Sequence, residues 1–500
     1  MNKIRLFFII FLFLIINIFP AQKPSTEIEQ LYKEAQFSRI IDILEEKDFN
    51  ALSSSEKLHL IECLARTSQR NKAQVLLNKI WDNLPLSCEA HATAAIVSLS
   101  NGHFTLAEHS IEKALMLNPE CPKALMTKMM LLLHLQQYRD ALTLYEEFGK
   151  KYPLWSDTYL LYLMGIEVYG AAGNLAKIAE LYSKKARGLK EENRERSADL
   201  HKNSQIYRKA SKKRVYMIKS SSDKMVLPFV RTSNEVSYVK ICLEIKEKKF
   251  NIILDTGNTV GWLIHSRELN TLLKSKQGGA SLIQIAGEEG LLHGRHIYTE
   301  QVDLGAFSIH HLPGMYVPKP HPSYPEANLN PIFIKDHVVT MDFQADQFII
   351  RSKSKFQEDL EHIVEHPENM TILPWYGYEQ PLIPVIVGES QQALALVETG
   401  AEDISLRLEF AQKSQMPLES ADRYLATGKK YSHQKTNVKV SLGPYLFERT
   451  EAEVWPLDGF TDPLMGLAPD IIIGPKAFKD KFVISFDPFE KKIILTRRSF

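Results

Sequence analysis

The stretch FNIILDTGN at residues 250–258 decides the fold of the second half of the chain, because a copy of it follows further on. The copy reads LALVETGA at residues 394–401, and it places Glu398 where the first stretch has Asp255. In both stretches a short apolar run ends on an acidic residue followed by Thr and Gly. This pattern predicts a buried strand that leads into a tight turn carrying a carboxyl group.

Two further landmarks repeat in the same order. VDLG at 302–305 corresponds to VSLG at 440–443, and VTMDF at 339–343 corresponds to ISFD at 484–487. The interval from Asp255 to Asp342 is 87 residues, and the corresponding interval from Glu398 to Asp487 is 89. Short apolar runs bounded by Gly, Pro and Asn predict strands throughout. We therefore predict two all-β lobes, lobe one at 226–360 and lobe two at 366–500.

Residues 226–500 resemble the retropepsin-like aspartic peptidases, and most closely the exported bacterial type with two lobes on one chain. The resemblance rests on DTG at 255–257 after an apolar strand, on its duplicate, on a candidate helix at 266–273 and on a glycine-bearing hairpin at 287–290. It implies an all-β bilobal aspartic-peptidase fold that hydrolyses a polypeptide lying extended between the lobes. It implies no metal and no organic cofactor.

The resemblance also implies roles for individual residues. Asp255 would be the base that activates water, and Glu398 would share its proton. Two carboxyl groups about 3 Å apart can divide these roles, because charges that close cannot both ionise. The active-site loops would be supported by Thr256, Gly257, Thr259, Thr399 and Gly400. The flap over the substrate would be formed by Gly287, Glu288, Glu289 and Gly290, with a counterpart near residues 427–429.

Three positions depart from the family pattern. Glu398 stands where the family has Asp, Glu402 replaces a supporting Ser or Thr, and ANL at 327–329 lacks the usual apolar-apolar-Gly element. One alternative is an active peptidase with an Asp/Glu dyad. Another is a catalytically inactive pseudo-peptidase that binds extended peptide as an interaction scaffold. A third is an active site formed by the Asp255 lobes of two chains.

The first half of the chain has a 34-residue period. Pro85, Pro119 and Pro153 keep this spacing, as do Ala73, Ala107 and Ala141. The period resembles the tetratricopeptide repeat and predicts an all-α helical-repeat solenoid at 27–189, with an insertion of about three residues in its last unit. Such repeats either present a concave surface to a protein partner or serve as a spacer for the next domain. The whole chain is therefore predicted to be multidomain.

Residues 190–225 are predicted to be a basic linker. The surrounding stretch 184–219 holds thirteen Lys or Arg against four Asp or Glu. A solvated connector or exposed helix is favoured over a segment that binds an anionic membrane face.

The N-terminal sequence resembles an export signal. Lys3 and Arg5 precede an apolar run at 6–16, which is typical of a signal peptide. We expect residues 1–21 to be a signal peptide or an uncleaved membrane anchor, and the body to be periplasmic or extracellular. The net charge of +1 argues against binding to nucleic acid.

The four cysteines are predicted to be buried thiols. Cys88 and Cys121 occupy nearly equivalent points of successive repeats, which would place them too far apart for a disulfide. No spacing of Cys, His or acidic residues predicts a metal site.

Overall fold

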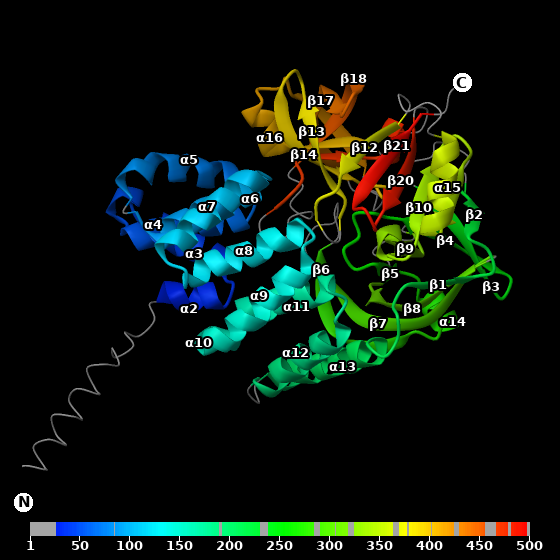
Figure 1. Cartoon of the computed structure of the whole chain (residues 1–500), viewed down its shortest axis with the longest axis horizontal. Helices are drawn as coiled ribbons and strands as arrows, with labels where there is room; N and C mark the ends of the chain where they lie inside the picture. Colours follow the sequence, from blue (N-terminus) through cyan, green and yellow to red (C-terminus); the bar gives the residue numbers. More distant parts are fainter. Residues whose placement is uncertain are drawn as a thin grey trace, which may run out of the picture.

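The structure is a computed structural model that contains a helical region followed by a β-rich region (Figure 1). It describes residues 27–84, 86–189, 193–230, 239–284, 291–305, 307–318, 325–363, 370–377, 380–401, 403–424, 430–455, 467–478 and 482–497. The predicted signal segment, the predicted flap tip and Glu402 lie outside these ranges. Among the described residues, no helix has both the length and the apolar character needed to cross a membrane.

Helix pairs with a regular spacing make up the N-terminal region. Its helices are α2 (Glu27–Lys33), α3 (Phe37–Glu45), α4 (Ser54–Arg66), α5 (Arg70–Ile80), α6 (Cys88–Ser100), α7 (Phe104–Leu117), α8 (Pro122–His134), α9 (Tyr138–Lys151), α10 (Pro153–Ser156), α11 (Tyr159–Ala171) and α12 (Leu175–Arg187). The helices α4, α6 and α8 begin 34 residues apart, as do α5, α7 and α9. The next pair begins 37 residues on, which confirms the three-residue insertion.

Buried alanines let the helices of a pair approach closely. Ala73, Ala107 and Ala141 are fully buried, as their 34-residue spacing predicts. The turn within each of these pairs has one residue with a positive φ, namely Ser68, Gly102 or Gln136. Ser68 and Gln136 adopt this conformation at a steric cost that glycine does not have.

A buried ionic cluster lies between helices α2, α4 and α8. Glu62 on α4 is fully buried, and it pairs with Arg66 at 2.9 Å and with Lys123 at 2.7 Å. These cations hold the pKa of Glu62 at about 2, although burial opposes them. Tyr32 on α2 donates its hydroxyl to the same carboxylate and packs edge-on against Trp155. Part of the inner face is therefore covered by the chain itself.

The two lobes have the same strand order. In lobe one it is β3 (Lys240–Ile245), β4 (Lys248–Leu254), β9 (Ala327–Leu329), β5 (Trp262–Ile264), β8 (Phe307–Tyr316), β7 (Leu291–Leu304) and β6 (Lys276–Gln284). In lobe two it is β13 (Leu382–Val387), β14 (Gln391–Val397), β19 (Ile471–Ile473), β15 (Ile404–Arg407), β18 (Tyr445–Trp455), β17 (Lys430–Leu442) and β16 (Glu419–Tyr424). The parallel pairs also correspond, because β4–β9 and β5–β8 match β14–β19 and β15–β18. The predicted duplication is thus present in the topology.

A third sheet joins the lobes. Its order is β12 (Met370–Pro374), β21 (Lys492–Thr496), β20 (Val483–Asp487), β10 (Val338–Asp342), β11 (Gln347–Arg351) and β2 (Lys224–Pro228). The central strands β10 and β20 come from the two repeated VTMDF and ISFD landmarks and pair antiparallel. The Thr340 and Ser485 hydroxyls meet there at 2.8 Å. The sheet therefore fixes the two lobes as near-symmetric neighbours.

Short helices follow corresponding strands. They are α14 (Arg267–Leu272) after β5 and α16 (Leu408–Lys413) after β15, with η4 (Pro331–Phe333) after β9 and α17 (Pro475–Phe478) after β19. The helix predicted at 266–273 is confirmed, with Ser266 accepting the N–H of Leu269 at its N-cap. A further helix, α15 (Lys353–Ile363), ends lobe one.

Residues 193–225 are not a solvated connector, whereas the predicted alternative of an exposed helix is confirmed. This segment contains α13 (Arg194–Ala210), β1 (Met217–Ser220) and the start of β2. α13 packs along α12 and across β6, while β1 pairs with β8. Its charged residues lie on exposed faces, whereas Asn203, Ser204, Ile206 and Ala210 are buried. The segment has few apolar residues because only one face of α13 is covered.

The helical region packs directly on lobe two. Its within-pair turns reach the outer face of β13, β14 and β19, where Leu394, Leu396 and Ile472 join the helical core. Phe104 stacks on Tyr376 with ring centroids 4.7 Å apart, and Gln136 donates to the Trp375 carbonyl at 2.7 Å. Figure 1 shows the helical pairs beside lobe two, with α12 and α13 running on to lobe one. The region is therefore built into the β-rich part along one edge.

Cys63, Cys88 and Cys121 are buried free thiols as predicted, and only the prediction for Cys242 is wrong. Cys242 is exposed, because it lies on the outward side of the edge strand β3. The sulfur atoms of Cys88 and Cys121 lie within 4.8 Å of each other, because both side chains point into the same space between α6 and α8.

Candidate functional site

The two DTG-like loops meet at the boundary between the lobes. Thr256 donates its hydroxyl to the Val397 carbonyl at 2.6 Å, and Thr399 donates its hydroxyl to the Leu254 carbonyl at 2.6 Å. Each threonine hydroxyl also accepts the backbone N–H of the other, at 3.0 and 3.1 Å. Both residues are buried. These reciprocal bonds hold the ends of β4 and β14 together, although 143 residues separate them.

Asp255 is held by two hydrogen-bond donors from its own lobe. Its backbone N–H bonds to the Leu329 carbonyl at 2.9 Å, so β9 fixes the start of the loop. The Gly257 N–H donates to Oδ1 at 3.2 Å, and the Asn328 amide donates to Oδ2 at 2.6 Å. These two donors fix the orientation of the Asp255 side chain.

Glu398 has a different environment. Its side chain is buried, and its Oε1 accepts the Gly400 N–H at 2.6 Å. Oε2 has no hydrogen-bond partner of good geometry among the described residues. Burial, followed by the negative charge and hydrogen-bonding contact of Asp255, raises the pKa of Glu398 well above its ordinary value, against the effect of the Gly400 N–H. This arrangement therefore favours the protonated form of Glu398.

The turn glycines are required by the close approach of the carboxyl groups. A Cβ built on Gly400 would lie 2.9 Å from both Asp255 Oδ1 and Glu398 Oε1. A Cβ on Gly257 would overlap Glu398 Oε2 outright, because the longer glutamate side chain reaches across to lobe one. The two carboxyl groups therefore lie within reach of a shared proton, which is the arrangement that the sequence predicts for Asp255 and Glu398.

Thr259 does not take the position predicted for it. Its side chain is exposed, and no hydrogen bond joins it to Asp255 in the described structure. Asn328 supplies the donor to Asp255 instead, from the segment 327–329 that departs from the family pattern. The sequence feature that pointed to Asn328 is its polar side chain within the otherwise apolar strand β9. Its partner could not be chosen from the sequence, because β9 pairs with β4 more than seventy residues earlier.

Two more amides support the lobe-one loop. Asn330 is fully buried, and its amide donates to the carbonyls of Asn258 at 2.9 Å and Thr256 at 3.3 Å. Gln380, at the entry to lobe two, donates to the Gly257 carbonyl at 2.9 Å. Asn330 thus holds the lobe-one loop in place. The equivalent position in lobe two, directly after β19, is Gly474.

The predicted flap residues Gly287, Glu288, Glu289 and Gly290 lie outside the described residues, as does the counterpart at 427–429. The described strands on either side, β6 and β7, form an antiparallel hairpin, as do β16 and β17. The lobe-one hairpin is braced by α13. The Asn203 side chain accepts the Gly279 N–H at 2.7 Å, and the α13 backbone lies so close that a Cβ on Gly279 would collide with Asp199.

A partly buried histidine lies at the same brace. His296 on β7 packs at a steep angle against the stacked rings of Tyr182 and Tyr207, with ring centroids 5.9 and 5.7 Å away. Burial lowers the pKa of His296 to about 4. The histidine is therefore neutral at physiological pH, and it couples the hairpin to α12 and α13 through apolar contact.

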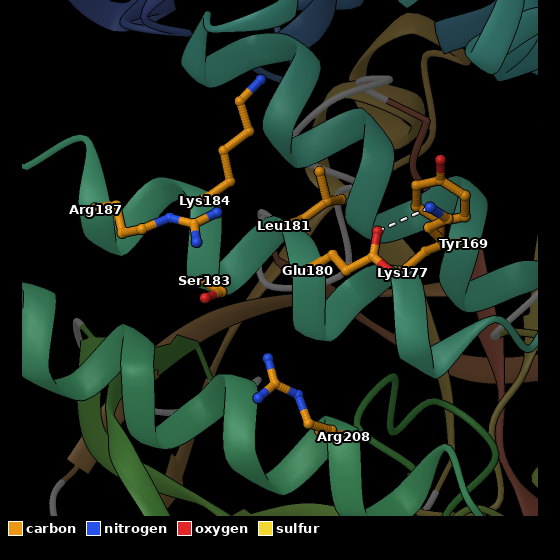
Figure 2. A pocket seen from close by; sticks show the side chains of 8 residues that line it. All are labelled: Tyr169, Lys177, Glu180, Leu181, Ser183, Lys184, Arg187 and Arg208. Carbon is orange, nitrogen blue, oxygen red and sulfur yellow. Dashed lines mark hydrogen bonds and ion pairs between the residues drawn. The ribbon is translucent and has the colours of Figure 1, made fainter.

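A separate pocket of about 460 Å³ lies between α11, α12 and α13 (Figure 2). Half of its eight lining residues are cationic, namely Lys177, Lys184, Arg187 and Arg208. Lys177 pairs with Glu180 at 2.8 Å (Figure 2). None of the predicted site residues lines this pocket, so the carboxyl pair remains the candidate site.

Comparisons with known proteins give no family for this chain. No protein-family model matches it, and no curated protein sequence matches it. Among solved structures it is similar to conglutin gamma, a basic 7S globulin from lupine seeds, at 9% identity and a TM-score of 0.34, covering 56% of this chain and 96% of that one. It is also similar to the basic 7S globulin from soybean, at 10% identity and a TM-score of 0.29, covering 56% and 97%.

A third structure, MamA MSR-1 C2, has 15% identity and a TM-score of 0.19, covering 37% of this chain and 99% of that one. At these TM-scores none of the three likenesses carries an argument about function.

Proposed function

We propose that this chain is an aspartic-type peptidase that hydrolyses polypeptide bonds with an Asp255/Glu398 dyad. The observation that carries the proposal is the meeting of the two carboxyl groups between corresponding loops of a duplicated β domain. A charged Asp255 can take a proton from water, while a protonated Glu398 can donate one to the substrate carbonyl oxygen. The pair would titrate as a unit.

The substrate of this peptidase is an extended polypeptide. It would lie between the lobes, above the carboxyl pair and beneath the hairpin of β6 and β7. Backbone pairing with the hairpin would hold a peptide independently of most of its side chains. The fold we assign to residues 226–500 is the bilobal aspartic-peptidase fold.

The helical region is assigned to the tetratricopeptide-like class, on its 34-residue spacing and fully buried alanines. One of its edges is occupied by lobe two and part of its inner face by its own ionic cluster. A protein partner would therefore bind the remaining outer surface. The basic start and apolar run of residues 1–21 support export to the periplasm or beyond, with the membrane reached only through that segment.

The test is cleavage of a mixed peptide library by the purified chain between about pH 3 and pH 8, read by mass spectrometry. Asp255→Asn and Glu398→Gln are each expected to lower the rate by about 10²–10⁴-fold, which is the usual contribution of a general acid or base. Asp303→Asn is the matched control, because Asp303 is an exposed lobe-one carboxylate distant from the dyad in sequence. Unchanged peptides that nevertheless bind to the protein would instead support the pseudo-peptidase.

Exchange of the unusual acid tests whether the site is built around glutamate. Glu398→Asp is expected to lower the rate, because Oε1 and Oε2 already fit against Gly400 and Gly257. A large gain would mean that the native pair is misplaced. One chain supplies both carboxyl groups, so activity is expected to remain with the monomer on size-exclusion chromatography.

A further inference from the structure

Two cysteines and a glutamate converge at one end of the helical pairs. Cys88 is the first residue of α6, and Cys121 is the N-cap of α8. Their sulfur atoms and a carboxylate oxygen of Glu89 all lie within 4.8 Å of one another. In the part of the chain that the structure describes, these residues are the sole group of His, Cys, Asp and Glu with this geometry.

The surroundings of the two sulfur atoms are apolar and closely packed. Ala92, Ala114 and Ala124 form a small cluster with Cys88 and Cys121. Cys121 is fully buried and Cys88 is 5% exposed, whereas Glu89 is exposed. The group is therefore closed on the cysteine side and open to solvent on the glutamate side.

The polar groups of this site are two thiols and one carboxyl group. The nearest cation in the sequence, Lys123, is engaged by Glu62 at 2.7 Å. The Cys121 side chain makes no capping hydrogen bond to α8. A bound cation would offset the negative charge of these ligands.

We propose that Cys88, Cys121 and Glu89 bind a divalent thiophilic metal ion of the zinc class. Two thiolates and a carboxylate are ligands that zinc accepts, and the fourth tetrahedral position would hold water on the exposed side. Ligands about 2.3 Å from one ion lie at most about 4.6 Å apart, so the observed separations need little adjustment. The ion would join the α6/α7 pair to the α8/α9 pair and is independent of the peptidase proposal.

The third ligand distinguishes this site from a disulfide pair. A disulfide would use only the two sulfur atoms and would leave Glu89 without a role. Metal binding uses all three groups and releases the thiol protons, so the affinity is expected to rise with pH.

The experiment uses the full chain, reduced and stripped with a chelator, and Zn²⁺ as the only probe. One equivalent of Zn²⁺ per chain is expected by equilibrium dialysis, and Co²⁺ is expected to give a thiolate-to-metal charge-transfer band. Cys88→Ala and Cys121→Ala are each expected to weaken binding by more than about tenfold, and Glu89→Gln by less. Cys63→Ala and Cys242→Ala are the matched controls and are expected to retain the affinity of the parent chain.

A measurement on the unaltered chain tests the proposal in a way that does not depend on whether the variants fold. Zn²⁺ is expected to protect Cys88 and Cys121, but not Cys242, from alkylation, as read by peptide mass spectrometry. No stoichiometric binding, binding that survives Cys121→Ala, or recovery of Cys88 and Cys121 as a disulfide that persists in the purified chain would each overturn the proposal.

Discussion

In lobe one, two asparagines lie at positions where lobe two has apolar residues. Asn251 and Asn328 correspond in strand pairing to Leu394 and Ile472. Asn328 turns its amide to Asp255, whereas Leu394 and Ile472 pack against the helices. The same topology thus carries a solvated, hydrogen-bonded carboxylate in one lobe and a buried carboxyl group under a helical cover in the other. Two copies of one fold can therefore give their acidic residues different surroundings, because helices cover the sheet face at these positions in lobe two, whereas Asn328 bonds to Asp255 in lobe one.

The first prediction tests how the longer acid of lobe two depends on lobe one. Gly257→Ala is expected to lower activity by at least about a hundredfold, because the new Cβ occupies the place of Glu398 Oε2. The double variant Gly257→Ala/Glu398→Asp is expected to recover part of the loss, because the shorter acid withdraws from the new methyl group. Peptide cleavage rates of the single and double variants measure the coupling. No recovery would show that the methyl group acts through the backbone.

The second prediction breaks the helical cover of lobe two. Arg70 on α5 is 3% exposed; it pairs with Asp470 and donates to the carbonyls of Ala468 at 3.0 Å and Ser100 at 3.2 Å. Arg70→Met leaves a buried carboxylate without its cation, so the free energy of unfolding is expected to fall by about 3–5 kcal/mol. Denaturant titration measures it.

Arg39→Met is the control for this experiment, because Arg39 and its partner Glu27 are both exposed. A change within about 0.5 kcal/mol is expected there. Equal effects of the two substitutions would contradict a structural role for the cover.

The third prediction breaks the brace on lobe one. Asn203→Leu removes the acceptor of the buried Gly279 N–H, which is expected to cost about 1–3 kcal/mol. Hydrogen exchange is expected to quicken in β6 and β7 and to stay unchanged in β16 and β17. Asn71→Leu is the matched substitution, because Asn71 donates to the Glu409 carbonyl of lobe two through a longer, partly buried bond of 3.4 Å. A hairpin that is unaffected by loss of Asn203 would show that α13 merely lies beside it.

The fourth prediction, which has the smallest expected effect, concerns how the free energy of unfolding changes with pH. The pKa of Glu398 is raised in the folded chain by burial and by Asp255, so the folded state keeps a proton that the unfolded state loses above about pH 4.3. This contribution to stability is complete below that pH and declines as the pH rises, by at most about 1.4 kcal/mol per pH unit. Glu398→Gln is expected to flatten the decline in denaturant titrations. An identical slope in both proteins would mean that Glu398 is ionised when folded.

The local patterns predicted most of the elements. The 34-residue period placed the helix pairs because each repeat buries the same face, and the three-residue insertion is visible as a shift in helix starts. The duplicated FNIILDTGN and LALVETGA stretches predicted β4 and β14, and the two threonines and acids do meet. Composition alone could not separate a connector from an exposed helix at 190–225, because only one face of α13 is buried.

The sequence by itself determined the helical and β-rich halves, the internal duplication and the two acids, because periodicity and repeated motifs are recorded within short stretches of chain. Only the tertiary structure decided that Asn328 rather than Thr259 supports Asp255, that helices cover lobe two, and that α13 braces the lobe-one hairpin. These contacts join segments far apart in the chain, and which partners meet depends on the packing of whole sheets and helices.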